Sequence, residues 1–388
     1  MDDLKTLFRR ILDSLAFGIL QFVPARPDHW AFVLHRGHVW SGNLRVLAEH
    51  AARHHGIKIV VLCRDGGRSP AAMPAATWTD SPAALAYIRC GVIFSTHEPE
   101  PNATSPLRIA RITSRQRYLL WHGVGTKVHS RDAHPWMRSV KCFFDSTFAA
   151  SEHDKDRLAR AFGFEPARIA VTGYPRIEVL KCAETQLTDD LADQHSALRA
   201  ALAGKTLVLA APTFDTVRDQ PDAVIDFVIR LRAMLEARFE VGLRLHPNNL
   251  LRNTTLKVPK GILDLGPRQW PSTEMVLRNS GVLVTDFSSI WADFALLRRP
   301  IIGLKPFTAP YVENGRVSPA LWDEFPGTWC ETVEQTVKCI MDTRHEPADS
   351  AKLDAAVRRI HGEQPDSSEQ ICRWVFARQP GADRPPSA

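Results

Sequence analysis

Apolar residues in this chain gather in short runs, separated by segments in which apolar and polar residues recur at helical spacing. Strands of a parallel sheet read as continuous apolar runs because both faces of the sheet are covered. The alternation therefore predicts an α/β protein with parallel, doubly wound sheets. The predicted strands lie at residues 30–35, 58–63, 91–95, 117–121, 147–150 and 169–173, and then at 206–211, 241–245, 282–285 and 300–304.

A polar helical segment without a strand, Lys181–Ala203, separates the two series of predicted strands. The chain of 388 residues is also long enough to form more than one core. We expect two Rossmann-like domains, over residues 27–185 and 186–345, and a C-terminal segment of helices and disordered tail over 346–388. The helical patterns of that last segment lie at residues 351–361 and 367–377.

Residues 1–26 carry an amphipathic helical pattern with Lys5, Arg9 and Arg10 among its polar positions. Its uninterrupted apolar stretch, Leu15–Val23, is too short to span a bilayer. We expect neither a transmembrane helix nor a signal peptide, because acidic residues precede the bases and no cleavage site of small residues follows. The helix fits the inner face of a bacterial membrane, and it fits equally a helix packed on its own domain.

The composition excludes few classes of binding partner. The net charge of +6 suits an anionic ligand or membrane surface, while no motif indicates nucleic acid. Seven scattered cysteines, odd in number and never spaced as a metal-binding pair, indicate reduced thiols in a cytoplasmic protein. Asp154-Lys155-Asp156 fits the Asp-x-Asp pattern of nucleotide-sugar enzymes, but it lies inside a predicted capped helix, Ser151–Ala161. We therefore expect no obligatory metal and no cofactor.

The first candidate for chemistry is His122, which follows an apolar run and precedes the Gly123-Val124-Gly125 turn. Glycines let a ligand approach the backbone, and a histidine titrates where it can accept a proton from a hydroxyl. A lone histidine is nevertheless more often structural. Lys127 follows closely and suits a phosphate contact, although a solvated surface lysine explains it equally well.

A second histidine, His246, ends a predicted strand of the second half, with Pro247 after it and Arg244 on the same side of the strand. Its imidazole suits neutralising charge on a phosphate oxygen, or simply bonding a loop carbonyl. Two histidines at matching positions of two α/β halves predict chemistry at a cleft between the halves. Ligands of such sheets bind at the carboxyl ends of the strands.

Further polar residues follow other predicted strands. Thr285, Asp286, Ser288 and Ser289 open a helix, where free N–H groups and hydroxyls form an anion site or merely a cap. Asp286 is also suited to a ligand hydroxyl. Two residues elsewhere complete the set of candidates: Arg176 after Gly173-Tyr174-Pro175, as an anion clamp, and Thr213 after Ala211-Pro212, as a phosphate donor.

Five of these motifs, in order and well spaced, resemble the CDP-glycerol glycerophosphotransferase family of teichoic-acid primases and polymerases. They are Trp121-His122-Gly123, Gly173-Tyr174-Pro175-Arg176, Ala211-Pro212-Thr213, His246-Pro247 and Thr285-Asp286-Phe287-Ser288-Ser289. The resemblance covers roughly residues 28 to 340 and includes Gly42-Asn43. It implies a glycosyltransferase B-type (GT-B) fold, two Rossmann-like domains facing a central cleft, with the donor held mainly by the C-terminal domain.

The reaction implied by this resemblance is phosphoryl transfer from a CDP-linked polyol to a lipid-linked or surface glycan acceptor, with release of CMP. In that scheme His122 is the base and His246 stabilises the pyrophosphate. Lys127, Arg176, Thr213, Arg244, Thr285, Asp286, Ser288 and Ser289 are the substrate-binding set. Such chemistry serves teichoic-acid-like polymers, capsules or other cell-surface polymers.

The chain departs from the family pattern near the predicted cleft. Val124-Gly125-Thr126 stands where Thr-Pro-Leu is usual, Ile177-Glu178 where Asn-Asp is usual, and Phe214-Asp215 where Trp-Arg is usual, with Arg218 as a substitute for that arginine. Both histidines remain, so the reaction class is better determined than the substrate. A GT-B glycosyltransferase, a UDP-sugar 2-epimerase-like isomerase and a catalytically silent binding protein stay open as alternatives.

Overall fold

The computed structural model describes most of the chain and divides it into two compact units. The described residues are 24–34, 39–62, 76–79, 89–97, 115–124, 137–246, 249, 257–313, 319–342, 350–363 and 366–379. Unit 1 takes in the described residues up to His122, then 137–175, and those from 366 onward; unit 2 takes in Gly123, Val124 and the described residues of 176–363. The predicted N-terminal helix and Lys127 lie outside the described residues.

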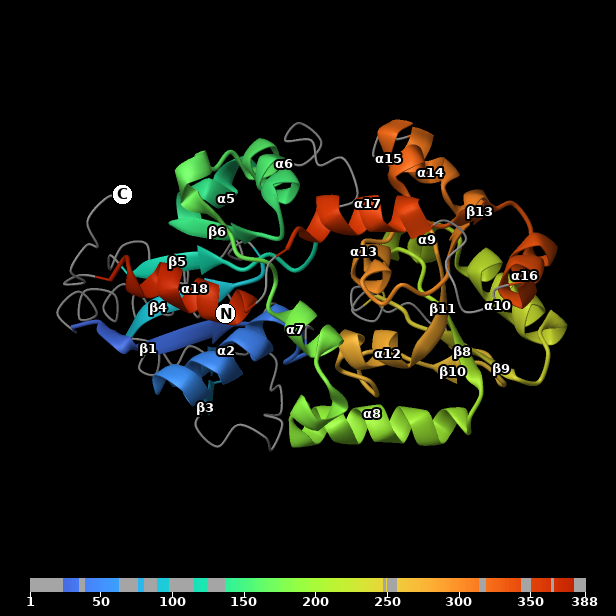
Figure 1. The fold of residues 1–388 in the computed structure, drawn as a ribbon, viewed down its shortest axis with the longest axis horizontal. Coiled ribbons are helices and arrows are strands. Elements are labelled where there is room, and N and C mark those ends of the chain that lie inside the picture. Colours follow the sequence, from blue (N-terminus) through green and yellow to red (C-terminus); the bar gives the residue numbers. More distant parts are fainter. Residues whose placement is uncertain are drawn as a thin grey trace, which may run out of the picture. The chain divides into compact units, whose positions relative to one another are not determined.

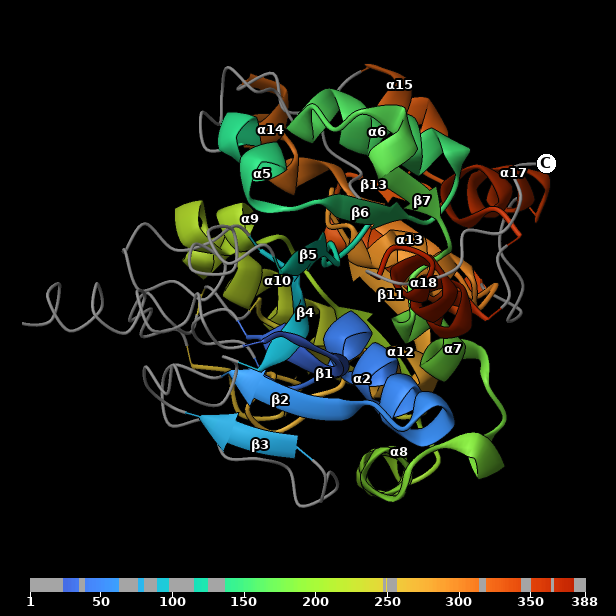
Figure 2. The ribbon, with the colours of Figure 1, turned by 90° about the vertical axis from the view of Figure 1, so that its left-hand side faces the viewer.

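Unit 1 is built on a parallel sheet in the order β3-β2-β1-β4-β5-β6-β7 (Figures 1 and 2). Its strands are β1 (Arg26–Val33), β2 (Lys58–Leu62), β3 (Ala76–Thr79), β4 (Cys90–Ser95), β5 (Gln116–Leu119), β6 (Ser146–Ala149) and β7 (Ile169–Val171). Its helices are α2 (Gly42–His55), α5 (Met137–Phe143), α6 (Glu152–Phe162) and α18 (Ser367–Phe376), with a 3-10 turn at Pro166–Arg168. The chain reverses its direction of progress across the sheet between β1 and β4, which makes this pair the topological switch point.

Unit 2 repeats this plan with the order β10-β9-β8-β11-β12-β13. Its strands are β8 (Thr206–Ala210), β9 (Phe239–Leu243), β10 (Leu263–Asp264), β11 (Ser280–Thr285), β12 (Ile301–Leu304) and β13 (Thr328–Cys330). Its helices are α7 (Arg176–Lys181), α8 (Asp189–Leu202), α9 (Phe214–Asp219), α10 (Pro221–Met234), α12 (Thr273–Asn279), α13 (Ile290–Ala295), α14 (Ala309–Glu313), α15 (Pro319–Glu324), α16 (Val333–Asp342) and α17 (Ser350–His361). The switch point lies between β8 and β11, so both units are doubly wound as predicted.

Both faces of each sheet are covered, as the continuous apolar runs require. In β8, Val208 and Ala210 pack into a cluster with residues of α10 and α16, while Leu207 and Leu209 on the other face are also fully buried. In unit 1, Phe32 and Phe94 pack against α2 and α18. Within the described residues, no helix is long and apolar enough to cross a membrane.

The C-terminal helix α18 returns to unit 1 and is anchored on α2 by a charged contact. Glu369 Oε2 lies 3.1 Å from His50 Nε2 and 2.8 Å from His55 Nε2. Partial burial opposes ionisation of Glu369, but the hydrogen bonds from His50, His55 and Arg373 outweigh it and lower its pKa to about 2. Because the pKa falls on folding, this carboxylate stabilises the fold fully above its ordinary pKa of 4.5 and loses the effect as the pH drops toward 2.

We therefore expect Glu369→Gln to lower the free energy of unfolding at pH 6, and the deficit relative to the native chain to shrink as the pH falls from about 4.5 to 2. Urea denaturation at a series of pH values measures it. The exposed Glu236, changed to Gln, is the control and is expected to give a small, pH-insensitive difference. A deficit for Glu369→Gln that stays constant down to pH 2 contradicts the prediction.

Candidate active site

Asp286 organises the carboxyl edge of the unit 2 sheet. It follows β11 and is fully buried. Its Oδ1 accepts hydrogen bonds from the backbone N–H groups of Thr213 and Ser288, both at 3.0 Å. Its Oδ2 accepts from the hydroxyls of Thr213 and Thr216, both at 2.6 Å. The carboxylate thus ties the loop after β8 to the loop after β11 at the switch point. A direct substrate contact of Asp286 or Thr213 stays a prediction.

Thr285 and Arg244 are also engaged with the protein itself. The Thr285 hydroxyl donates to the carbonyl of Ala211 at 2.7 Å. The buried guanidinium of Arg244 donates to the carbonyls of Leu265 at 2.6 Å and Trp270 at 3.0 Å. Burial lowers the pKa of Arg244 to about 10. Both side chains therefore hold the loops at the carboxyl edge of the sheet. Their contacts with substrate stay a prediction.

Ser288 and Ser289 present open polar groups at this edge. Ser288 is half-buried and Ser289 is exposed, directly before α13. Within the described part of the chain, neither hydroxyl has a hydrogen-bond partner, and the Ser289 hydroxyl does not cap the helix. The N–H group of Ser288 already donates to Asp286, whereas the two hydroxyls and the N–H group of Ser289 are suited to phosphate oxygens.

Arg176 orients α13. Its Nε and Nη2 donate to the two carboxylate oxygens of Asp293 at 2.8 and 2.9 Å, a two-bond pairing of largely buried groups. Asp293 lies in α13, one turn beyond the serines. Arg176 therefore fixes the helix that presents Ser288 and Ser289, and its predicted role as an anion clamp stays a prediction. The sequence analysis did not single out Asp293. The one indication was that an acidic residue stands among apolar residues in a short predicted helix.

His246 is exposed and lies three residues after the end of β9, and its predicted role at the pyrophosphate stays a prediction. Its ring centroid lies 6.0 Å from that of Phe214. Asn249 joins the two loops, because its N–H donates to the carbonyl of His246 at 2.9 Å and its side-chain amide to the carbonyl of Phe214 at 3.2 Å. Arg218, the predicted substitute, lies over Phe214 and pairs with Asp215 and Asp219.

In unit 1, His122 follows β5 and its ring is held on two sides. Its Nδ1 lies 3.3 Å from the carbonyl oxygen of Thr96. The ring of His97 stacks on it at 4.7 Å with an angle of 7° between the planes. A carbonyl only accepts hydrogen bonds, so Nδ1 carries the proton in the neutral ring and the lone pair falls on Nε2. This is the tautomer that a general base needs.

His97 was not among the predicted site residues. It comes two residues after β4, the switch-point partner of β1, and the Ser95 hydroxyl donates to its carbonyl at 2.9 Å. Its Nδ1 lies 2.7 Å from the Thr96 hydroxyl. The signal was available, because Ser95-Thr96-His97 ends an apolar run in the same way as Trp121-His122.

Asn43 positions the segment that carries His122. Its buried amide at the start of α2 donates to the carbonyl of Trp121 at 2.8 Å. If His122 is the base that the family resemblance implies, we expect Asn43→Ala to lower kcat about tenfold to a hundredfold with little change in KM, because a small displacement of a base costs that much. Steady-state kinetics of the CMP release that the family resemblance implies measures the change. Ser41→Ala, beside the same helix start, is the control, and an equal loss there contradicts the positioning role.

The Asp154-Lys155-Asp156 sequence lies in α6, as predicted. The Ser151 hydroxyl accepts from the N–H of Asp154 at 3.2 Å and caps the helix. Asp154 itself is fully buried, accepting from Tyr174 at 2.8 Å and from Arg157. Its carboxylate is thereby committed to the packing of unit 1.

Comparison with known proteins identifies the family. The sequence profile of the CDP-glycerol:poly(glycerophosphate) glycerophosphotransferase family matches residues 16–377. The chain belongs to this family. The resemblance drawn from the five motifs is thus confirmed.

Curated relatives of the family are polymerases of teichoic acid. The teichoic acid poly(ribitol-phosphate) polymerase of Bacillus spizizenii is 25% identical over 241 residues, 58% of this chain and 38% of the relative. The teichoic acid ribitol-phosphate polymerase TarL of Staphylococcus aureus is 26% identical over 204 residues, 49% of this chain and 35% of the relative. The chain thus spans less than two fifths of the length of these relatives.

The fold is shared with solved structures. The wall teichoic acid polymerase TagF superimposes with a TM-score of 0.76 at 16% identity, over 96% of this chain and 95% of that one. The UDP-GlcNAc 2-epimerase from Neisseria meningitidis matches with a TM-score of 0.52 at 12% identity, over 90% of this chain and 99% of that one. The GT-B-type fold predicted from the family resemblance is confirmed.

Proposed function

We propose that this chain transfers glycerol phosphate or ribitol phosphate from a CDP-linked donor to a hydroxyl of a lipid-linked or surface glycan, releasing CMP. Family membership indicates the reaction class. The observation that carries the mechanism is the orientation of His122, whose contact with the Thr96 carbonyl leaves Nε2 as the basic nitrogen. The names of the relatives indicate both glycerol and ribitol phosphate as candidate units.

In this mechanism an acceptor hydroxyl oxygen attacks the β-phosphorus of the donor and its proton passes to His122 Nε2. The bond between the β-phosphorus and the oxygen bridging it to the α-phosphorus breaks, and CMP leaves with the electron pair. The hydroxyls of Ser288 and Ser289 and the N–H group of Ser289 bind phosphate oxygens, and His246 neutralises charge on the pyrophosphate. Phosphoryl transfer depends mainly on such positioning and charge stabilisation.

The supporting side chains hold the loops and the helix of this site in place through contacts within the protein. Asp286 joins the two switch-point loops, and Arg176 with Asp293 sets the direction of α13. A site whose donors are already in place does not spend binding energy on reorganisation. We propose that Thr213, Thr285, Asp286, Arg176 and Arg244 act in this supporting way, and that Lys127 contacts phosphate.

The decisive experiment is CMP release from CDP-glycerol and from CDP-ribitol, with and without a bacterial lipid or glycan extract. Acceptor-dependent CMP from one donor establishes the reaction and names the polyol. Release of a nucleoside diphosphate from a nucleotide sugar indicates glycosyl transfer instead. Epimerisation of a UDP-sugar without any acceptor indicates the isomerase.

We also propose that the enzyme works at the cytoplasmic face of the bacterial inner membrane, held there by the amphipathic pattern of residues 1–26. Removal of residues 1–24 is the test. The full chain is expected in the membrane fraction and the shortened chain in the supernatant. An unchanged distribution contradicts the attachment and leaves the transferase proposal untouched.

A further inference from the structure

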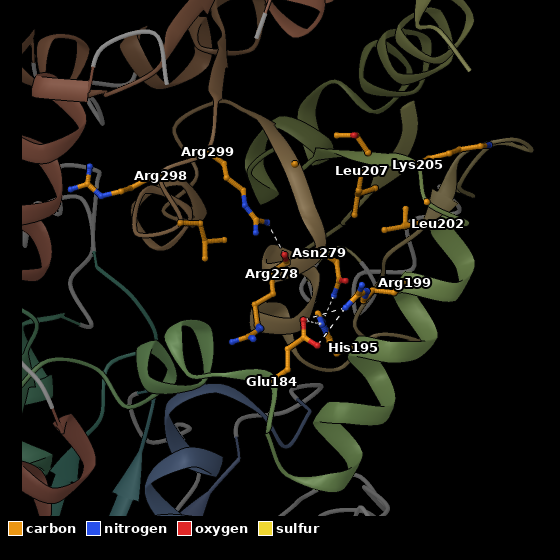
Figure 3. A pocket seen from close by; sticks show the side chains of 14 residues that line it. Glu184, His195, Arg199, Leu202, Lys205, Leu207, Arg278, Asn279, Arg298 and Arg299 are labelled. Carbon is orange, nitrogen blue, oxygen red and sulfur yellow. Dashed lines mark hydrogen bonds and ion pairs between the residues drawn. The ribbon is translucent and has the colours of Figure 1, made fainter. Parts of the chain in front are cut away.

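A second group of charged side chains lies at the opposite edge of the unit 2 sheet, where the strands begin (Figure 3). β8 begins there at Thr206, and Gly281 of β11 lies at the same edge. A cavity of about 790 Å³ opens between α8, the end of α12 and the turn before β12. Cationic side chains dominate its lining: Arg199, Lys205, Arg278, Arg298 and Arg299, against the carboxylate of Glu184.

Arg278 and Arg299 are bound to the protein by one nitrogen each. Nη1 of Arg278 donates to the carbonyls of Val179 at 3.0 Å and Cys182 at 2.7 Å, at the end of α7. Nη1 of Arg299 donates to the carbonyls of Arg278 at 2.6 Å and Ser280 at 2.7 Å. Within the described residues, no carboxylate pairs with either guanidinium, and the Nε and Nη2 atoms remain accessible to solvent.

The guanidinium of Arg299 lies against the backbone of Arg278, since it contacts the carbonyl of that residue at 2.6 Å. Burial and the nearby charge of Arg278 lower the pKa of Arg299 below its ordinary value. Arg199 faces the cavity from α8, where it shares Glu184 with His195 (Figure 3). Lys205 pairs with Glu240, Arg298 with Asp354 and Arg199 with Glu184. Among the described residues the cations of the group without a carboxylate pair are therefore Arg278 and Arg299, and an anion bound beside them would compensate their charge.

We propose that this cavity binds a phosphate group, as a phosphomonoester or phosphodiester, at a site separate from the donor site. A guanidinium offers paired N–H donors that match two phosphate oxygens, and the free edges of Arg278 and Arg299 supply such donors. The cavity has room for more than one phosphate, which suits either a small phosphate ligand or a stretch of a polyol-phosphate chain. Arg199 lines the cavity from α8 and offers a further guanidinium to the ligand.

Titration calorimetry with inorganic phosphate and with a glycerol-phosphate trimer tests the site directly. The trimer distinguishes a polyol-phosphate chain from a small phosphate ligand. A site for a chain segment binds the trimer more tightly than inorganic phosphate, whereas a site for a single phosphate binds both with similar affinity. The charge reversal Arg199→Glu is the main variant, since this side chain is 62% exposed and its removal leaves the fold intact. Arg230→Glu, on α10 of the same unit and 50% exposed, is the matched control.

We expect Arg199→Glu to weaken phosphate binding at least tenfold, Arg299→Gln to weaken it similarly with a melting curve still cooperative, and Arg230→Glu to leave it unchanged. Ser288→Ala with Ser289→Ala is expected to weaken donor binding but to keep this phosphate site. Equal losses in Arg199→Glu and Arg230→Glu, or no binding by the native chain, overturn the proposal and leave the arginines as caps of helix ends. Because binding is measured without turnover, failure of the transferase proposal does not affect the result.

Discussion

The His122→Ala variant is expected to release CMP about a hundred to ten thousand times more slowly than the native chain, the range that a positioned general base contributes. The donor is expected to bind as before, because the proposed phosphate contacts come from the other unit. The reason for expecting so large a loss is the tautomer: the Thr96 carbonyl at Nδ1 leaves Nε2 as the basic nitrogen of this ring. Single-turnover CMP release and calorimetry with the donor measure the two quantities separately.

His54→Ala is the control for this loss, since His54 is another exposed histidine of unit 1. It is expected to turn over like the native chain. Added imidazole is expected to restore part of the activity of His122→Ala and to do nothing for an Asn43→Ala chain, in which the base is present but displaced. Retained turnover in His122→Ala, or loss of donor binding in place of turnover, rules out the base role.

Asp286→Ala is expected to destabilise unit 2 by about 3 kcal/mol or more, since the change leaves several buried donors without an acceptor. These donors are the backbone N–H groups of Thr213 and Ser288 and the hydroxyls of Thr213 and Thr216. All four surround a fully buried carboxylate at the switch point. Urea denaturation measures the change in the free energy of unfolding.

Asp264→Ala is the matched control on the same unit. Asp264 is exposed at the end of β10, and its carboxylate accepts the backbone N–H of Gly266 at 2.8 Å. We expect its loss to cost about 1 kcal/mol or less. Similar losses for the two variants contradict the view that Asp286 holds the switch-point loops together.

The central strands could be predicted because they are buried on both faces. β1, β2, β4, β8 and β11 all fall within predicted apolar runs to within a few residues. The strands that prediction missed, β3, β10 and β13, all lie at sheet edges. These three strands are short and carry no continuous apolar run, whereas the edge strand β7 has one and was predicted. β3, β10 and β13 are therefore recognised only when the sheet is assembled.

The domain boundaries were harder to predict than the strands. One change of unit falls between Pro175 and Arg176 and another between His122 and Gly123, and α18 lies with unit 1 although it comes after all of unit 2 in the chain. Its apolar residues Ile371 and Val375 pack with Leu47 and Ala51 of α2. An amphipathic pattern predicts that one face of a helix is buried, but it does not predict which core that face packs against.

By itself, the sequence determined the α/β class, the central strands, the family and the two histidines at strand ends, because these depend on local runs and on motifs read in order. The tertiary structure decided which polar residues touch one another. The sequence predicts Thr213, Thr285 and Arg244 as ligand contacts, which stays a prediction, and the structure adds that their polar groups contact Asp286, Ala211 and Leu265. The stacking of His97 on His122, and the clustering of Arg199, Arg278 and Arg299, join residues far apart in the chain. Such pairings follow from strand order and crossover, which bring distant loops to one edge of a sheet.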